Sequence, residues 1–169
     1  MVVRTTNATT MDAPFSKATA TVLPTWIDYN GHMNVGYYHV AFDLAAEPFF
    51  EWLGLTPEFR KQHASSTFAL QSQLHYLREV KVGEKLRFES RLIDADRKRI
   101  HYYQEMFHAE EGYLAATYES LSVHMDMTQR RSAPMPTALY QRMQDVLAIH
   151  QRLVRPWQVG HVFGVKPPF

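Results

Sequence analysis

Residues 34–54 carry the hydrophobic pattern of an amphipathic helix. Asn34 is a favourable N-cap residue, and Gly54 is a natural place for a helix to stop. The pattern therefore predicts one helix of about 20 residues, or roughly 30 Å. One side of it is polar at steps of four residues, at His39, Asp43, Glu47 and Glu51. The other side is apolar at alternating steps of three and four residues, at Val35, Tyr38, Phe42, Ala45, Phe49 and Trp52.

Most of the remaining periodicity is that of β-strands. Between residues 86 and 92 a charged side chain occupies every second position, as expected for a strand with one buried face. Glu110-Glu111-Gly112 is typical of a hairpin turn. Helical spacing returns over residues 137–151, whereas residues 56–66 are expected to form a loop. Strands are predicted at residues 15–23, 67–77, 86–92, 99–108 and 114–125.

This order of elements predicts an α+β fold. One strand precedes the long helix, four antiparallel strands follow it, and a shorter helix closes the series. An antiparallel β-sheet wrapped around one long central α-helix would bury the apolar side of that helix. The chain of 169 residues is expected to form a flexible tail (1–12), one domain (13–154) and an extension (155–169). The extension is aromatic and is expected to pack on the domain through Trp157, Phe163 and Phe169.

The composition argues against several function classes. The chain has 18 Lys and Arg residues against 17 Asp and Glu residues, which disfavours a protein that coats nucleic acid. It has no cysteine, so disulfides, thiolate nucleophiles and cysteine-based metal sites are excluded, and a reducing compartment fits. No apolar run approaches the roughly 20 residues of a membrane span, and residues 1–11 lack the apolar core of a signal peptide. We therefore expect a soluble cytoplasmic protein that binds neither nucleic acid nor membrane.

The segment Asp28-Tyr29-Asn30-Gly31-His32-Met33-Asn34, called the motif below, carries the candidate chemistry. A carboxylate follows an extended segment, a glycine turn comes next, and an asparagine begins the helix. The carboxylate and the free N–H groups of the helix N-terminus would thus meet at one point. A reaction that builds negative charge on a carbonyl oxygen needs these two components. The alternative is structural, because an aspartate before a helix is most often a turn or capping residue.

The motif and the order of elements resemble a known family. They are similar to the hotdog-fold acyl-CoA thioesterases of the 4-hydroxybenzoyl-CoA thioesterase type over residues 15–145, with further similarity at 82–86 and 126–136. The family pattern is Asp-x-x-Gly-His-x-Asn with a tyrosine ten residues after the aspartate. This sequence supplies it with Asp28, Gly31, His32, Asn34 and Tyr38.

Two departures and one closer similarity refine the resemblance. Val35 stands where members often have a second asparagine, and residues 43–46 lack the arginine of the Glu-x-Ala-Arg segment in many members. Residues 26–34 are similar to a group of thioesterases that release glycine betaine from betainyl-CoA in bacterial carnitine breakdown. The resemblance therefore implies hydrolysis of a small acyl-CoA thioester, with betainyl-CoA as the best candidate substrate.

The resemblance also implies roles for the motif. Asp28 would either attack the thioester carbonyl to form a mixed anhydride or act as a general base on water, and both remain open. Backbone N–H groups between Gly31 and Asn34 would polarise the carbonyl oxygen. His32 would either transfer protons or hold the loop in place by hydrogen bonds. We count all four residues as candidate catalytic residues.

Further residues are candidates for substrate binding. Aromatic faces attract a quaternary ammonium group, and the motif is crowded by Trp26, Tyr29, Tyr37 and Tyr38. Asp43 would add a negative charge, although it could equally belong to a solvated side of the helix. CoA enters as part of the substrate, and no other cofactor and no metal are predicted. Its phosphates suit arginine-rich clusters, for which the candidates are Arg97, Lys98, Arg99, Arg130 and Arg131, although each could simply be solvated.

The resemblance implies an assembly of at least two chains. Family members pair their sheets edge to edge into dimers and often tetramers, so we expect a homodimer or homotetramer with the site at the subunit interface. Asp28 would come from one chain and some CoA contacts from the other. Two other functions remain open at this point: a hydratase or dehydratase on the same fold, and a regulatory module that binds acyl-CoA without hydrolysing it.

Overall fold

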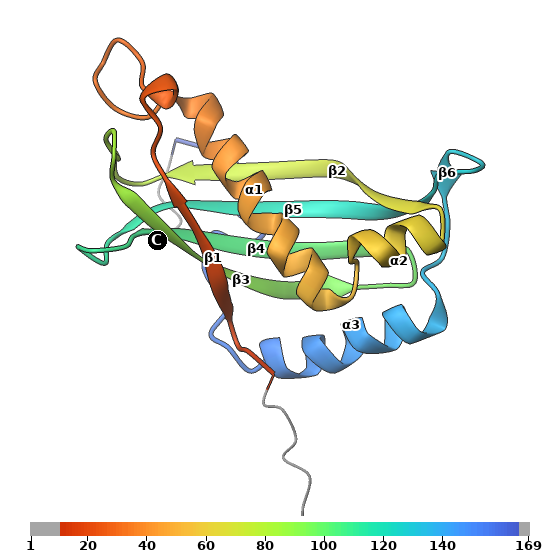
Figure 1. Cartoon of the computed structure of the whole chain (residues 1–169). Coiled ribbons are helices and arrows are strands. Elements are labelled where there is room, and N and C mark those ends of the chain that lie inside the picture. The colour runs from red at the N-terminus through yellow and green to blue at the C-terminus, as the bar shows by residue number, and fades with distance from the viewer. Residues whose placement is uncertain (1–10, 166–169) are drawn as a thin grey trace, which may run out of the picture.

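One antiparallel sheet curls around one long helix in the computed structural model, which describes residues 11–165 (Figure 1). The strands lie in the order β1-β3-β4-β5-β2, and β6 pairs with β5. Every pairing is antiparallel, so the predicted α+β hotdog fold is confirmed. The strands are β1 (Phe15–Thr21), β2 (Ser65–Tyr76), β3 (Lys85–Ala95), β4 (Arg99–His108), β5 (Leu114–Asp126) and β6 (Arg131–Ser132).

All five predicted long strands are present, with small differences at their ends. β2 begins at Ser65, two residues before the predicted start. β3 runs on to Ala95 because a register shift between Leu92 and Asp94 lets the strand continue past the irregularity. β2 pairs with β5 rather than with β3, its successor in the chain. Strand periodicity does not encode the pairing partner, and this pairing leaves β2 at one edge of the sheet.

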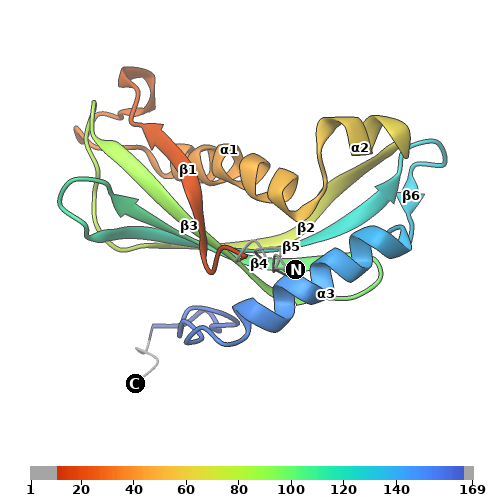
Figure 2. The ribbon, with the colours of Figure 1, turned by 60° about the horizontal axis from the view of Figure 1, so that its bottom comes forward.

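Helix α1 (Val35–Leu53) lies in the hollow of the sheet (Figure 2). Its caps are the predicted ones: the Asn34 side chain accepts a hydrogen bond from Gly36 N, and Gly54 ends the helix with φ 109°. Of the predicted apolar side, Val35 is 61% exposed because it lies at the first helical position, beyond the sheet. The buried side is wider than predicted, since a helix inside a curled sheet is covered over much of its circumference. It comprises Tyr38, Ala41, Phe42, Ala45, Ala46, Phe49, Phe50 and Leu53.

A short helix, α2 (Pro57–Gln62), occupies most of the segment that we predicted to be a loop. That prediction was wrong because six residues are too few to display a helical period. The local start signals were nevertheless present. Thr56 Oγ1 accepts a hydrogen bond from Phe59 N at 3.1 Å, and Pro57 stands at the first helical position, where its missing N–H costs nothing.

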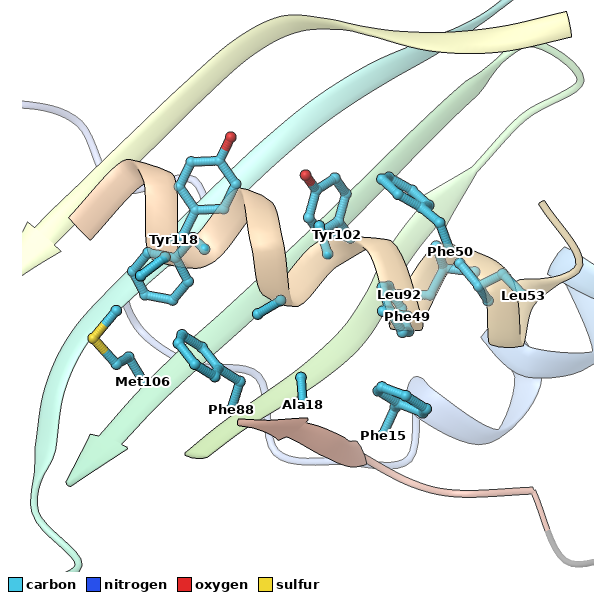
Figure 3. Packing of buried hydrophobic residues seen from close by; sticks show 14 of the residues in the cluster. Phe15, Ala18, Phe49, Phe50, Leu53, Phe88, Leu92, Tyr102, Met106 and Tyr118 are labelled. Atoms are coloured by element: carbon cyan, nitrogen blue, oxygen red, sulfur yellow. The ribbon is translucent and has the colours of Figure 1, made fainter. Parts of the chain in front are cut away.

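Aromatic side chains fill the space between α1 and the sheet (Figure 3). The Phe42 ring stacks on the Tyr118 ring at 5.3 Å between centroids and meets Phe88 edge-on at 5.7 Å. Tyr102 of β4 meets Phe50 edge-on at 5.2 Å. Burying one such side chain contributes about 1.5–3 kcal/mol. This packing fixes the axis of α1, and with it the position of the helix N-terminus.

Helix α3 (Thr137–His150) packs alongside β3 and near the end of α1 (Figure 1). His150, its last residue, is 3% exposed and makes two hydrogen bonds. Its Nδ1 accepts from Leu92 N at 2.9 Å, beside the irregularity of β3, and its Nε2 lies 2.9 Å from the Asp12 carbonyl oxygen. The buried imidazole therefore joins α3, β3 and the segment before β1.

The C-terminal segment crosses the sheet on the face opposite α1. Arg91 donates to the Val154 carbonyl at 2.9 Å, and Gly160 N donates to Glu119 at 2.8 Å. The Trp157 ring lies 5.4 Å from the His75 ring, so this aromatic residue packs as predicted. Phe163 is 96% exposed, and the prediction that it packs was wrong because the chain leaves the sheet beyond His161, whose ring still contacts His75.

Residues 1–10 of the predicted tail, and Phe169 of the extension, lie outside the described residues. Within residues 11–165, no helix combines the length and the apolar character that a membrane crossing requires.

Candidate active site

The motif forms a tight loop that leads directly into α1. Gly31 N donates to the Asp28 carbonyl at 3.0 Å, and Asp28 N donates to the His32 carbonyl at 3.1 Å. Gly31 has φ 81°, a left-handed conformation that L side chains rarely adopt, so the turn requires glycine. Ile27 and Met33 pair across the base of the loop as an isolated bridge. The loop thus closes on itself, with Asp28 at its first corner.

Two backbone hydrogen bonds attach this loop to the rest of the fold. Asn34 N donates to the Trp26 carbonyl at 2.9 Å, and Met33 N donates to the Val80 carbonyl at 2.9 Å. Met33, Val80 and Trp26 are all buried. Buried hydrogen bonds of this kind resist opening, because a broken one would leave unsatisfied polar groups away from water. The position of Asp28 is therefore set by the core.

The Asp28 carboxylate is half-buried and held by two donors. Asn30 N donates to its Oδ1 at 2.8 Å, and Asn34 Nδ2 donates to its Oδ2 at 3.3 Å. The other side-chain atom of Asn34, Oδ1, accepts from Gly36 N at 3.0 Å and caps α1. One asparagine thus links the carboxylate to the first turn of the helix. The carboxylate therefore lies beside the helix N-terminus, but the N–H groups of Gly36 and Tyr37, which were expected to be free, donate to Asn34.

His32 lies in the same loop but faces its own backbone. Its Nδ1 is 3.2 Å from the Met33 carbonyl oxygen, a contact that places the proton on Nδ1. Among the described residues, no carboxylate makes a hydrogen bond or ion pair with the His32 ring. This geometry favours the structural alternative for His32 over a proton-transfer role.

The four predicted aromatic residues divide into three groups. The Trp26 and Tyr37 rings stack on each other, 5.8 Å apart and 15° from parallel, so each covers a face of the other. Tyr29 is 96% exposed at the tip of the loop. Tyr38 is buried and meets the ring of Tyr76, from the end of β2, edge-on at 5.2 Å. The structure therefore does not gather these four rings around one point.

A cavity of about 240 Å³ adjoins the motif. Tyr38 contributes its ring, and its hydroxyl lies 3.4 Å from the Arg78 carbonyl oxygen, to which it donates. Burial raises the pKa of Tyr38 to about 12, so its hydroxyl stays protonated at neutral pH. The walls combine the end of the motif and the start of α1 with the segment after β2, and are formed by His32, Met33, Val35, Tyr38, Tyr76, Leu77, Arg78 and Glu79.

Comparison with protein families gives a match to the thioesterase-like superfamily over residues 22–143. The chain belongs to this superfamily. The betainyl-CoA thioesterase of Pseudomonas aeruginosa is 32% identical over 146 residues, which cover 86% of this chain and 92% of that protein. The L-carnitine dehydrogenase/betainyl-CoA thioesterase of Rhizobium meliloti is 28% identical over 142 residues, or 83% of this chain. This chain matches only 28% of that longer relative.

Solved structures agree with this membership. A hypothetical protein from Staphylococcus aureus, solved in complex with CoA, has a TM-score of 0.82 and 25% sequence identity. The match covers 92% of this chain and 99% of that one. A putative thioesterase from Pseudomonas putida has a TM-score of 0.76 and 24% identity over 91% of this chain and 98% of the other, and supports the fold alone.

Asp43, predicted to bind substrate, lies on α1 away from the motif. It is exposed and lies nine residues after Asn34, so it is about 13 Å along α1 from the helix N-terminus. Polar groups lie nearby: the hydroxyl of Tyr118 lies 3.3 Å from His39 Nε2. The Asp43 charge is also close enough to Tyr102 to add slightly to the rise in the pKa of Tyr102, which is mainly due to burial. Within one chain Asp43 and Asp28 do not form one site.

The residues predicted to bind CoA lie at the opposite end of α1 from the motif. Arg97 and Lys98 lie in the turn between β3 and β4, and Arg99 begins β4; Arg130 lies in the turn before β6, and Arg131 begins β6 (Figure 1). Arg99 is already paired with Asp96 at 2.6 Å. The Arg97 guanidinium lies 4.8 Å from the centroid of the Tyr140 ring. Their role in CoA binding stays a prediction, and it requires a second chain.

Sequence reasoning missed the four consecutive residues Tyr76, Leu77, Arg78 and Glu79 of the cavity wall. They follow the motif by more than 40 residues and carry no recognisable local pattern. The hydroxyl of Tyr76 donates to the Val35 carbonyl at 3.4 Å, which ties the end of β2 to the first turn of α1. Only the pairing of β2 at the sheet edge brings these residues beside the motif.

Proposed function

We propose that this protein hydrolyses a small acyl-CoA thioester, and that its preferred substrate is betainyl-CoA, which yields glycine betaine and CoA. The observation that carries the proposal is the Asp28 carboxylate, tied through Asn34 to the N-terminus of α1 beside a cavity. Membership of the thioesterase-like superfamily supports the reaction. The relative that is 32% identical over most of both chains, named a betainyl-CoA thioesterase, supports the acyl group.

The proposed chemistry uses Asp28 in one of two ways. As a general base, the carboxylate takes a proton from water while the water oxygen bonds to the thioester carbon. As a nucleophile, a carboxylate oxygen bonds to that carbon, and a mixed anhydride forms and is then opened by water. In both cases the oxyanion lies near the N-terminus of α1, where the helix dipole stabilises negative charge. The C–S bond then breaks and CoA leaves as the thiolate.

Hydrolysis in water labelled with ¹⁸O tests for the nucleophilic route. When water opens the anhydride at the enzyme carbonyl, ¹⁸O enters the Asp28 side chain, and mass spectrometry of the digested protein detects it. The general-base route, like opening of the anhydride at the acyl carbonyl, leaves Asp28 unlabelled and places all label in the released acid. Either result is compatible with the proposed reaction.

The geometry of His32 disfavours a hydratase reaction at the motif. Such a reaction needs a histidine that works with a carboxylate, whereas the His32 ring contacts its own loop through the Met33 carbonyl. The regulatory alternative predicts binding without turnover. A thiol-release assay with purified protein and a panel of acyl-CoAs decides between them. Release of CoA from betainyl-CoA supports the proposal, and tight binding of the whole panel without any release would contradict it.

We also propose that the protein works as a dimer or tetramer with edge-to-edge sheets. β2 is an edge strand of 12 residues with exposed Phe68 and Leu70 near its middle, and such edges favour pairing. Antiparallel pairing of two β2 strands about a two-fold axis would place the partner's arginine-rich turns near the motif. A monomeric mass in solution with activity intact would contradict this assembly. A cytoplasmic location is part of the same proposal and fits the absence of cysteine.

A further inference from the structure

The cavity beside the motif is in the right place to hold the acyl group. In betainyl-CoA the quaternary nitrogen is only two bonds from the carbonyl carbon. If the carbonyl reacts at the N-terminus of α1, the nitrogen must lie within the first turn of the helix. Asp43, about 13 Å further along α1, is too distant within one chain. The walls of the cavity, by contrast, include His32 and Val35 from either side of the helix start.

Two tyrosine rings give this cavity an aromatic corner. The rings of Tyr38 and Tyr76 stand 5.2 Å apart at an interplanar angle of 89°. Each hydroxyl is directed at a backbone carbonyl oxygen, of Arg78 and Val35 respectively, at 3.4 Å, so the ring positions are fixed. A quaternary ammonium group has no N–H to donate and is recognised by aromatic faces. A cavity of about 150 Å³ holds a benzene molecule, so about 240 Å³ accommodates a trimethylammonium group.

The charge on the cavity wall is suited to a cation. Glu79 brings a carboxylate whose side chain is 58% exposed and whose ion pair with exposed Lys81 is long, at 3.5 Å. A surface pair of this kind contributes little and leaves the carboxylate available. Arg78, which also lines the cavity, has its guanidinium 3.8 Å from the centroid of the Tyr113 ring. Its charge is therefore already engaged with another aromatic face.

We propose that Tyr38, Tyr76 and Glu79 form the subsite that recognises the cationic acyl group, and that this subsite sets the preference for betainyl-CoA. The inference rests on the proposed thioesterase function and adds the residues that select the substrate. Tyr76 and Glu79 are specificity-determining residues in this assignment, and neither takes part in bond making or breaking.

The test compares betainyl-CoA with 3,3-dimethylbutyryl-CoA, which has the same shape with a carbon in place of the charged nitrogen. Wild type is expected to prefer betainyl-CoA. Glu79→Gln is expected to lower kcat/KM for betainyl-CoA about fivefold, mainly through KM, and to change the neutral substrate less than about twofold. Tyr76→Leu also loses the hydrogen bond to the Val35 carbonyl, so it should slow both substrates, and betainyl-CoA about tenfold more than the neutral one. Tyr76→Phe, which keeps the ring, should retain the preference.

Control variants distinguish failure of the subsite proposal from failure of the proposed substrate. Glu110→Gln, an exposed carboxylate in the turn between β4 and β5, should leave both substrates unchanged, and circular dichroism reports whether each variant folds. If Tyr76→Leu does not fold, Glu79→Gln and the charge-reversing Glu79→Lys still decide the outcome. Wild type that prefers betainyl-CoA, with variants that keep this preference, overturns the subsite alone. Wild type that hydrolyses no betainyl-CoA, or does not prefer it, overturns the proposed substrate and the subsite with it.

Discussion

Asp28→Asn is the sharpest perturbation of the proposed mechanism, because it removes a charge and almost no volume. The asparagine oxygen can still accept from Asn30 N, which now lies 2.8 Å from Asp28 Oδ1. The second position becomes an NH₂ group that faces Asn34 Nδ2, so the 3.3 Å hydrogen bond between Asp28 and Asn34 is lost. Asn34 keeps its contact with Gly36 N and still caps α1. The variant should therefore fold with a locally relaxed loop.

The expected magnitudes separate catalysis from stability. Loss of a general base costs about 10²–10⁴ in rate, equivalent to about 2.7–5.5 kcal/mol of barrier. One half-buried hydrogen bond to a carboxylate contributes about 1–2 kcal/mol to stability, which lowers the melting temperature of a chain of this size by about 3–6 °C. Activity should thus fall by orders of magnitude in a protein that remains folded at 25 °C.

The assay is direct because the chain has no cysteine, so a thiol reagent reports only released CoA. Initial rates with betainyl-CoA are compared for wild type, Asp28→Asn and the surface control Glu110→Gln. The control should match wild type. If Asp28→Asn retains more than about a tenth of the wild-type kcat, Asp28 is neither base nor nucleophile, and the proposed mechanism is refuted.

Two further predictions concern the loop and the C-terminal helix. In Gly31→Ala the alanine must adopt φ near 81°, at a cost of about 1–2 kcal/mol, and kcat/KM should fall at least tenfold. Asparagine tolerates this conformation, so Gly31→Asn should lose less activity. Equal losses of activity in the two variants would contradict the conformational reason. Burial lowers the pKa of His150, so the unfolded chain binds its proton first, and stability should be complete above about pH 6.5 and fall below it. Urea denaturation at about pH 7.5 and 5.5 measures this loss of stability. His150→Gln should be less stable, because the Leu92 N–H loses its imidazole acceptor, but its stability should depend less on pH. A pH dependence equal to that of wild type would show that other groups, such as His75, are responsible.

The parts of the fold that sequence predicts are those with a long local period. The α1 caps follow from the residue types at the two ends of its periodic stretch, and the strand centres from side-chain patterns over seven or more residues. The short α2 helix has less than two turns, so no helical period supports its start at Thr56-Pro57, and the helix was not predicted. The position of β2 at the sheet edge depends on its pairing with β5, which is set by packing between residues far apart in the chain.

The candidate site divides in the same way. The contacts of Asp28, Gly31 and Asn34 are local, and their geometry follows from a turn and a cap within seven residues. Of the four aromatic neighbours, only Tyr38 lines the cavity, because proximity in sequence does not decide where a ring points. Tyr29 faces solvent, while Trp26 is buried as part of the core. The arginine-rich turns are separated from the motif by the length of α1, so within a single chain they cannot contact a substrate bound at the motif.

The segment from Tyr76 to Val80 connects the cavity wall to the motif loop. Val80 accepts the hydrogen bond from Met33 N that holds the motif loop, and Tyr76 donates to the carbonyl of Val35 at the helix start. Tyr76, which lines the cavity, therefore also supports the helix start that follows the Asp28 loop. A change in acyl preference made here will move the catalytic loop unless both hydrogen bonds are kept. Substitutions that preserve the backbone of this segment and vary only the Glu79 side chain are thus the ones that can alter specificity without loss of rate.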